Sequence, residues 1–450
     1  MKTLTLPSSV RAFFSILLLG PSLGMAADVV LQKAPPLTVR QAPDYPENLA
    51  RYHFGADVKS TPESASLAGL QLSAKAQDEN TSAAALLCDD PTTGYRLPAG
   101  ASSILVSLPN IENIQTIAFL NDGAKGEMAI TVSSADVPEN SPAWRRIDNL
   151  ALAPGAVATK VGPGEAKYVK LSFKIDQPGR IAAFGIYATP ALSDFTMPRP
   201  RKVSFEESSE SFALINFNFS DVHAKARALY VSSGELSRAN AMLDDQPATA
   251  YQFAPEDDSP TAVIDLGRER ILSRLSAIYA AQPGSVDFYV LNHLPADTSD
   301  DADVNEASVQ QVAIIDQGAD LPASLKISEQ TFAQLTPVGS IVSTGEGRAS
   351  VNFPKVTGRY VMLKWQPAAR GEAFAIAQVA AFGPPKRVGA AGEMVYAQSD
   401  GKQLFDGKEI LDDKDIPAEG EALPPAEGPP PALPPVPPFT FIPEVPPTSP

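Results

Sequence analysis

The stretch Asp244-Asp245-Gln246-Pro247-Ala248-Thr249-Ala250-Tyr251 decides the fold, because the chain has already presented it as Asp89-Asp90-Pro91-Thr92-Thr93-Gly94-Tyr95. Three further blocks recur in the same order. Ser103-Ile104-Leu105-Val106-Ser107-Leu108 returns as Thr261-Ala262-Val263-Ile264-Asp265-Leu266, Tyr168-Val169-Lys170-Leu171 as Tyr360-Val361-Met362-Leu363, and Ala183-Phe184-Gly185 as Ala381-Phe382-Gly383. Recurrence of several blocks in one order indicates two copies of one domain, each a unit that folds by itself.

The composition between these blocks predicts the domain boundaries. We expect the first copy at residues 49–188 and the second at 211–384, with a Pro- and Glu-containing linker at 189–210. Residues 27–48 are rich in Pro and charge and are expected to form a tether. Residues 385–450 are expected to be a disordered, Pro-rich tail, with a small hairpin at 394–411 around two Asp-Gly dipeptides.

Apolar and polar residues alternate with a period of two inside both copies. Val169, Leu171 and Phe173 alternate with polar neighbours, and Val361, Leu363 and Trp365 occupy the same phase of a second run. This period is typical of half-buried strands, and no long amphipathic helix interrupts it. The sequence therefore predicts an all-β protein of two tandem antiparallel β-sandwiches.

Residues 1–26 have the pattern of a Sec-type signal peptide. Lys2 and Arg11 precede a short apolar run at 12–19, and small residues at 24–27 supply a cleavage site. The run is too short to span a bilayer, so we expect no membrane insertion after cleavage, with an uncleaved anchor as the alternative. The predicted location is secreted or periplasmic, in the cell envelope.

Charge and cysteine content narrow the partners. The formal net charge is −16, and the densest basic stretch, at 199–202, carries three charges. Nucleic acid and anionic membranes are bound by Lys and Arg clusters, so we expect neither as a partner. Cys88 is the single cysteine and cannot form an intrachain disulfide; we interpret it as a small buried apolar residue.

The order of the blocks resembles the discoidin domain, also called the coagulation factor V/VIII type C domain, of the galactose-binding-like jelly-roll superfamily. The second copy carries the resemblance best, in the Asp-rich loop at 241–251, the run Val263-Ile264-Asp265-Leu266-Gly267 and the Tyr-Val strand at 359–363. The first copy has Ser107-Leu108-Pro109 where the family has Asp-Leu-Gly. The resemblance implies jelly-roll binding modules, most often for glycans and sometimes for protein or lipid headgroups, and often with structural calcium.

The resemblance also implies a calcium site in each Asp-rich loop. The candidate ligands are Asp89 and Asp90 in the first copy and Asp244, Asp245 and Thr249 in the second. Calcium takes several hard oxygen ligands from carboxylates and carbonyls in a tight loop. The alternative is that each Asp caps its own turn by accepting backbone N–H bonds.

Two tyrosine-containing pairs are candidates for carbohydrate contact: Tyr95 with Arg96, and Tyr251 with Gln252. Each pair offers a ring on which a sugar stacks and a polar group that orients it. The alternative is that tyrosines at matching places in two repeats belong to the cores. Trp144 and Trp365 are expected to pack in the cores.

The sequence shows no constellation typical of an enzyme. His53, His223 and His293 lack metal-ligand spacing, and no nucleophile elbow, phosphate loop or dinucleotide fingerprint occurs. We therefore expect a non-catalytic binding protein that takes carbohydrate at a cell surface or on a polysaccharide. The alternatives are a structural or scaffolding envelope protein that contacts other proteins without binding glycan, and an accessory subunit of a separately encoded hydrolase.

Overall fold

The computed structural model describes residues 28–61, 82–138, 140–162, 164–190, 213–215, 217–295, 321–369, 371–384, 386–388 and 394–395. By contacts both sandwiches belong to one compact unit. The expected signal peptide and nearly all of the expected tail, including most of the hairpin at 394–411, lie outside the described residues. None of the described helices is long and apolar enough to cross a membrane.

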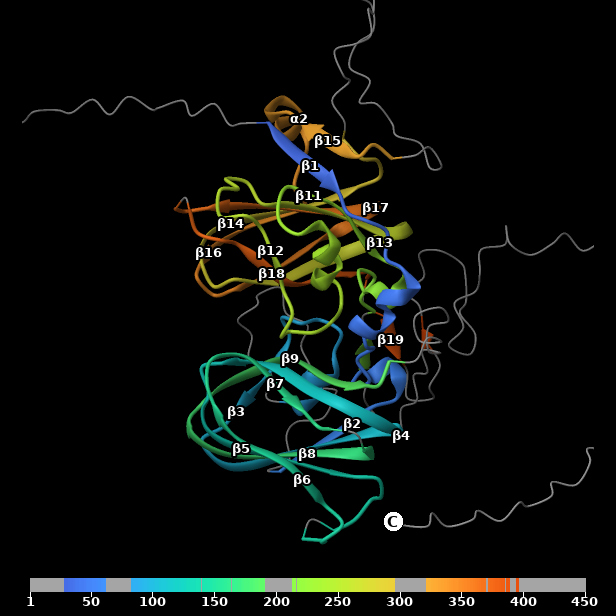
Figure 1. Ribbon diagram of the computed structural model, residues 1–450, viewed down its shortest axis with the longest axis vertical. Coiled ribbons are helices and arrows are strands. Elements are labelled where there is room, and N and C mark those ends of the chain that lie inside the picture. The colour runs from blue at the N-terminus through green and yellow to red at the C-terminus, as the bar shows by residue number, and fades with distance from the viewer. Residues whose placement is uncertain are drawn as a thin grey trace, which may run out of the picture. The chain divides into compact units, whose positions relative to one another are not determined.

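The described residues confirm the all-β prediction, with two antiparallel β-sandwiches of the jelly-roll kind (Figure 1). In the first sandwich the long strand β4 (Gly100–Asp122) belongs to both sheets. One sheet runs β2 (Asp57–Thr61), β4, β8 (Glu165–Gln177), β5 (Lys125–Ser133) and β6 (Arg145–Leu152). The other runs β3 (Gly94–Leu97), β9 (Gly179–Ala188), β4 and β7 (Gly155–Lys160).

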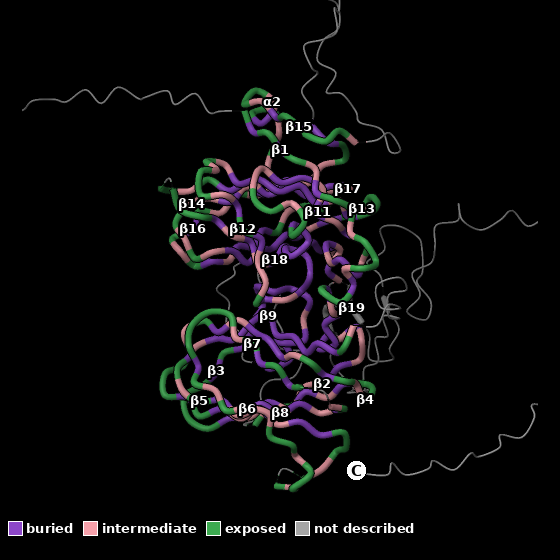
Figure 2. The backbone as a smooth tube through the Cα atoms, in the orientation of Figure 1, coloured by how far each residue is buried: buried purple, intermediate pink, exposed green. Residues whose placement is uncertain are grey.

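The second sandwich repeats this pairing. Its long strands β13 (Thr261–Tyr279) and β17 (Arg348–Pro367) both pass through the two sheets. One sheet contains β11 (Arg227–Val231), β13, β17, β14 (Pro283–Leu291) and β16 (Gly339–Thr344). The other contains β12 (Tyr251–Gln252), β18 (Ala375–Phe382), β13 and the first part of β17. Each sandwich has its own apolar core, and Figure 2 shows the buried residues concentrated along the strands.

Strand register tests the repeat residue by residue. Val106 lies opposite Val169, and Ile264 lies opposite Val361, so the second and third sequence blocks align as predicted. The fourth block is different. Ile181 lies opposite Tyr95, and Ile376 lies opposite the matching Tyr251. Counting onward from these two positions, the structural equivalent of Ala381-Phe382-Gly383 is Ile186-Tyr187-Ala188, three residues later than predicted. A small-aromatic-small triplet is too unspecific to fix register.

Part of the segment expected as a tether, residues 27–48, is a strand. β1 (Val29–Lys33) pairs with β11 at the edge of the second sandwich, and β15 (Ser324–Ile327) pairs with β1. The helix α2 (Glu329–Gln334) follows β15, and Figure 1 shows these three elements side by side. The apolar side chains of β1 explain the difference, because Leu31 is fully buried there.

A smaller sheet joins the start of the expected second copy to residues just beyond its expected end. β10 (Ala213–Ile215) pairs with β19 (Lys386–Val388), which pairs with β20 (Met394–Val395). Residues 386–388, expected to be disordered tail, are therefore strand residues, and their partner residues 394–395 lie at the start of the expected hairpin.

Candidate functional site

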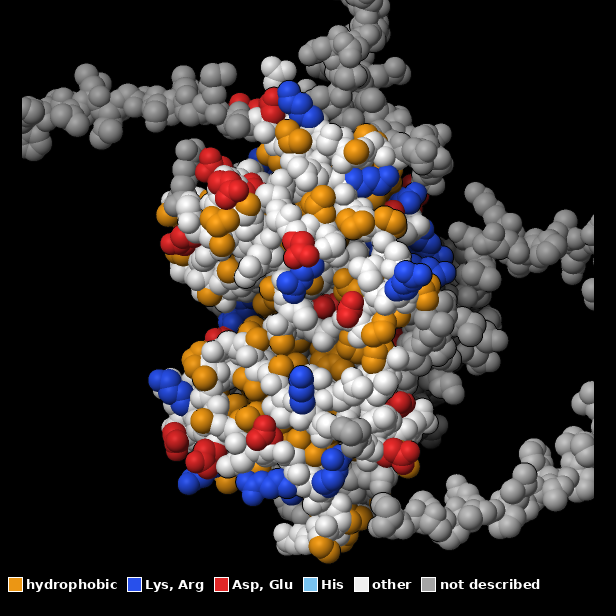
Figure 3. Space-filling view, in the orientation of Figure 1, with side chains coloured by type: hydrophobic (Ala, Val, Ile, Leu, Met, Phe, Trp, Pro, Cys, Tyr) orange, Lys and Arg blue, Asp and Glu red, His pale blue; other side chains and the backbone are white. Residues whose placement is uncertain are grey.

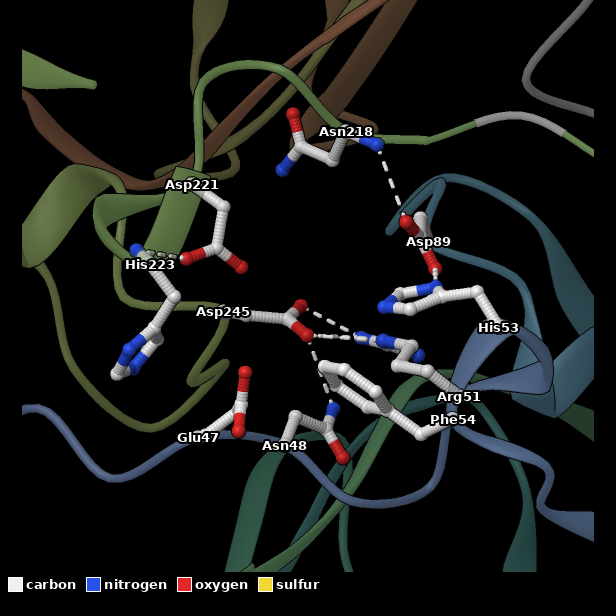
Figure 4. A pocket seen from close by; sticks show the side chains of 10 residues that line it. All are labelled: Glu47, Asn48, Arg51, His53, Phe54, Asp89, Asn218, Asp221, His223 and Asp245. Atoms are coloured by element: carbon white, nitrogen blue, oxygen red, sulfur yellow. Dashed lines mark hydrogen bonds and ion pairs between the residues drawn. The ribbon is translucent and has the colours of Figure 1, made fainter. Parts of the chain in front are cut away.

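A small polar pocket lies where loops of the two sandwiches meet (Figure 4). Its volume is about 30 Å³, which gives room for one or two water molecules and not for a sugar ring. Both sandwiches contribute lining residues, namely Glu47, Asn48, Arg51, His53, Phe54 and Asp89 from the first and Asn218, Asp221, His223 and Asp245 from the second. The pocket therefore marks the junction, by which we mean the region where these loops of the two sandwiches are in contact.

Matching segments of the two copies build this pocket. Asn48 Oδ1 accepts hydrogen bonds from the backbone of Ala50 and Ile186, and Asn218 Oδ1 accepts the corresponding pair from Ser220 and Ala381. Five residues after each Asn, a histidine lies in a one-turn 3-10 helix, η2 (Tyr52–Phe54) or η5 (Val222–Ala224). Both turns end on a residue with positive φ, which confirms the equivalence of the two backbones.

Asp245 of the second sandwich binds Arg51 of the first. Arg51 Nη2 lies 2.5 Å from Asp245 Oδ1, and its Nε donates to Oδ2 at 2.9 Å. Asn48 and Gln378 donate to the same carboxylate at 3.0 and 2.5 Å. The side chains of Arg51 and Asp245 are 3% and 8% exposed, so this is a buried, bidentate pair with further donors.

Asp90 of the first sandwich binds Arg274 of the second, which makes the exchange reciprocal. Arg274 Nε donates to Asp90 Oδ2 at 2.7 Å, and Ser276 donates to Oδ1 at 3.0 Å. Asp90 also accepts bonds from the backbone and hydroxyl of its neighbour Thr92. Each copy thus supplies one arginine to an Asp in the other copy's Asp-rich loop.

Further contacts cross the same junction. Asp89, which lies 3.0 Å from His53 Nδ1 of its own sandwich, accepts the backbone N–H of Asn218 of the second sandwich at 3.0 Å. Tyr187 donates its hydroxyl to the backbone carbonyl of Asp245 at 2.5 Å. Away from the pocket, Arg348 of the second sandwich pairs with Asp122 of the first.

Asp244 behaves differently, because its bonds stay inside its own loop. Its carboxylate accepts the backbone N–H of Gln246 at 3.0 Å and the hydroxyl of Thr249 at 2.8 and 2.9 Å. This is the turn-capping role that sequence analysis held as the alternative to calcium.

The candidate calcium ligands do not fit a calcium site as they are arranged. Asp90 and Asp245 each face an arginine from the other sandwich, and Asp89 faces His53 and a backbone N–H. Among the described residues, no three or more His, Cys, Asp and Glu side chains are grouped so that they could hold a metal ion. Side-chain and backbone donors at the junction contact all three of these carboxylates.

Burial and charge move the pKa values of these carboxyls in opposite directions. Burial acts to raise the pKa of Asp90, but Arg274 and the bonds from Thr92 outweigh it and hold that pKa below its usual value. Burial raises the pKa of Asp244 well above its usual value, and its hydrogen bonds only partly oppose this effect. For Arg51, burial is outweighed by Asp245 and Asp89, so its pKa is raised and it stays charged.

The tyrosine pairs proposed for sugar contact are divided between core and surface. The side chains of Tyr95 and Tyr251 are 4% and 1% exposed, and the hydroxyl of Tyr251 donates to Ser233 O at 2.5 Å. Arg96 and Gln252 are exposed, because successive residues of a strand point to opposite faces. Ring and polar group therefore cannot contact one ligand together, and the tyrosines belong to the cores.

The two tryptophans are also divided. Trp365 is 1% exposed and stacks on Phe374 with ring centroids 4.4 Å apart, as expected for a core residue. Trp144 is only half-buried; its Nε1 donates to Pro138 O at 3.0 Å, and Lys170 Nζ lies 5.9 Å from its ring. The expectation that Trp144 packs in the core is wrong, because it precedes an edge strand, β6.

The sequence did not predict the junction residues Arg51, Arg274, Asn48 and Asn218. One signal was present, since Asn48-Leu49-Ala50-Arg51-Tyr52-His53 and Asn218-Phe219-Ser220-Asp221-Val222-His223 share the spacing of Asn and His. The opposite charges at their fourth positions, Arg51 and Asp221, concealed this further repeat.

No protein-family model matches the sequence, and a search of curated proteins finds no match. Among solved structures, the chain is similar to an F-lectin (fucolectin) from striped bass serum, with 11% identity over 74% of this chain and 97% of that chain and a TM-score of 0.24. It is similar to chitosan-binding module 1 of a Paenibacillus chitosanase/glucanase, with 17% identity over 32% and 99% and a TM-score of 0.25. It is also similar to allantoicase of Saccharomyces cerevisiae, with 10% identity over 79% and 100% and a TM-score of 0.24. Function is therefore argued below from this chain's own residues.

Proposed function

We propose that this chain is an exported, non-catalytic carbohydrate-binding protein in which the first sandwich carries the binding surface. The observation that carries this proposal is the placement of Trp144 and Tyr168, both half-buried, near Lys170 at the outer face of the sheet containing β8. Sugars stack on partly exposed aromatic rings and take orientation from adjacent polar groups.

The contacts at the junction support placing the binding surface on a sheet face and not in the Asp-rich loops. The Asp-rich loops of both copies are engaged with each other, so they are not the surface that meets a ligand. Their buried, hydrogen-bonded ion pairs join the two copies, and removing one partner would leave an uncompensated charge. Ligand binding is then expected on the sheet faces and not in the loops.

A glycan-array screen of the chain lacking residues 1–26, run with calcium and again with chelator, tests the proposal. We expect binding that Trp144→Ala weakens about tenfold, the factor that corresponds to about 1.4 kcal/mol for a lost stacking contact. The matched controls are Arg96→Ala and Gln252→Ala, exposed positions that should leave binding unchanged. Equal binding with chelator would agree with the absence of a fitting metal site among the described residues.

The second candidate function is a structural or scaffolding envelope protein. The junction favours it too, because the Asp-rich loops of both modules contact each other. A blank array from protein with a cooperative unfolding transition would move the conclusion to this alternative.

A further inference from the structure

The outer face of the equivalent sheet is covered by other elements in the second sandwich and open in the first, within the described residues. In the second, the outer face of the sheet containing β11, β13, β17 and β14 forms an apolar cluster with β1, β15 and α2. The register places Tyr230, Val263, Met362 and Tyr289 in one row across these four strands, and each is at most 5% exposed. This face is closed by the chain itself.

The same row in the first sandwich is open and polar. The register there places Lys59 beside Leu105, Leu105 beside Lys170, and Lys170 beside Thr131. Position for position these replace Tyr230, Val263, Met362 and Tyr289, and Arg146 of β6 extends the row by one strand. All five residues are exposed or half-buried. Among the described residues, no strand or helix packs over this row as β1, β15 and α2 do in the second copy.

The row presents positive charge at regular spacing. Lys59, Lys170 and Arg146 are two strands apart from one another, and strands lie about 4.8 Å apart, so neighbouring cations stand roughly 10 Å apart. The adjacent row on the same face, from Thr61 to Asn149, carries no charge, and Asp57 lies two residues before Lys59 on β2. In Figure 3, Lys and Arg side chains are interspersed with Asp and Glu side chains over β5, β6 and β8.

Aromatic rings lie among these cations. Tyr168 is on the same face of β8 as Lys170, and the ring of Trp144 lies 5.9 Å from Lys170 Nζ. Leu105 is the one aliphatic residue of the row, which is too little apolar surface for insertion into a lipid layer. A flat face with spaced cations and adjoining rings suits a polymer that repeats both a negative charge and a ring with an apolar side.

From this charge complementarity we propose that the Lys59–Arg146 row of the first sandwich, with Trp144 and Tyr168, is the binding surface for an acidic polysaccharide with carboxylate or sulfate groups. This inference rests on the proposed carbohydrate-binding function and names the class of its ligand. The cations bind the anionic groups, and the rings stack on the sugars between them. The overall charge of −16 concealed this surface, because its cations come from separate strands.

Affinity electrophoresis or calorimetry of the chain at low salt, against polygalacturonate, dextran sulfate and neutral dextran, tests the inference. Polygalacturonate and dextran sulfate separate carboxylate from sulfate recognition. We expect binding to at least one polyanion, no binding to dextran, and about fivefold weaker binding for Lys170→Gln, the factor for an exposed ion pair of about 1 kcal/mol. The triple variant Lys59→Gln, Lys170→Gln, Arg146→Gln is expected to abolish binding. The control Lys160→Gln removes an exposed cation from β7, in the other sheet, and should bind as before.

Polyanion binding that the triple variant retains would overturn the inference. Binding of a neutral glycan on the array without any polyanion binding would overturn it while leaving the carbohydrate function intact, and a blank result against every glycan would overturn both. Vesicles of anionic phospholipid form a separate arm, and row-dependent binding to vesicles but not to either polymer would replace the polysaccharide with a lipid surface.

Discussion

The two sandwiches share their strand pairing and differ in what lies on one sheet face. Lys170 and Met362 occupy the same position of the same strand pair, yet one is half-exposed and the other is fully buried beneath the layer formed by β1, β15 and α2. Inner-face residues hardly differ in kind, because both cores need apolar side chains. The pairing of strands therefore sets the fold, while the outer face is free to diverge toward packing in one copy and toward solvent in the other.

The largest effect is expected when the buried Met362 is replaced by lysine, the residue at the equivalent position 170 of the first sandwich. In Met362→Lys an ammonium group would be buried in the apolar cluster with Leu31 and Phe332. A fully buried lysine shifts its pKa by about 3–5 units, so we expect a loss of about 4–7 kcal/mol in the free energy of unfolding. Urea denaturation measures it.

The reciprocal substitution Lys170→Met is the matched control. It places an apolar side chain on a face that is open in the described residues, so the free energy of unfolding should change by no more than about 0.5 kcal/mol. Similar losses for both substitutions would mean that the two faces are equally covered.

The junction offers a second comparison, because the arginines that pair with the two Asp-rich loops come from different kinds of segment. Asp245 is met by Arg51 from the segment that begins η2, whereas Asp90 is met by Arg274 from the strand β13. Arg51→Met would leave Asp245 buried without its cation. We expect a loss of about 3–5 kcal/mol in the free energy of unfolding, the range for breaking a buried pair.

A double variant measures the interaction between Arg51 and Asp245 apart from their contacts with neighbouring residues. Arg51→Met combined with Asp245→Leu removes both charges, and it should recover most of the lost stability because no uncompensated carboxylate remains. If the double variant is as unstable as the sum of the two single variants, the two residues do not interact in the way that their 2.5 Å contact indicates.

Much of this architecture was readable from the sequence, because alternation and short repeats are local signals. The strands around Val106, Val169, Ile264 and Val361 aligned as predicted. The junction was not readable, since Arg51 and Arg274 meet carboxylates that are 194 and 184 residues away. β1 was missed for a similar reason, because a five-residue strand among Pro and charged residues gains its partners β11 and β15 only in the folded chain.

The smallest expected effect concerns Asp90 and Asp244, whose contributions to the free energy of unfolding should change with pH in opposite directions. The pKa of Asp90 is lowered in the folded chain, so its contribution to stability is present above its unfolded pKa of about 3.9 and is lost as the pH falls through the folded value. The pKa of Asp244 is raised, so its contribution is present below about pH 3.9 and is lost as the pH rises through the folded value.

Asparagine at each position should therefore act in opposite directions. Asp244→Asn retains an oxygen for Gln246 N and removes the cost at pH 7 of burying a carboxyl group that is ionised in the unfolded chain, so we expect a gain of about 1 kcal/mol at pH 7 that disappears near pH 3. Asp90→Asn loses its charge pair with Arg274 and should destabilise at pH 7, with the difference narrowing near pH 3. Melting temperatures between pH 3 and pH 8 measure both. Parallel curves for the two variants would mean that these buried carboxyls experience the same surroundings, which their different partners argue against.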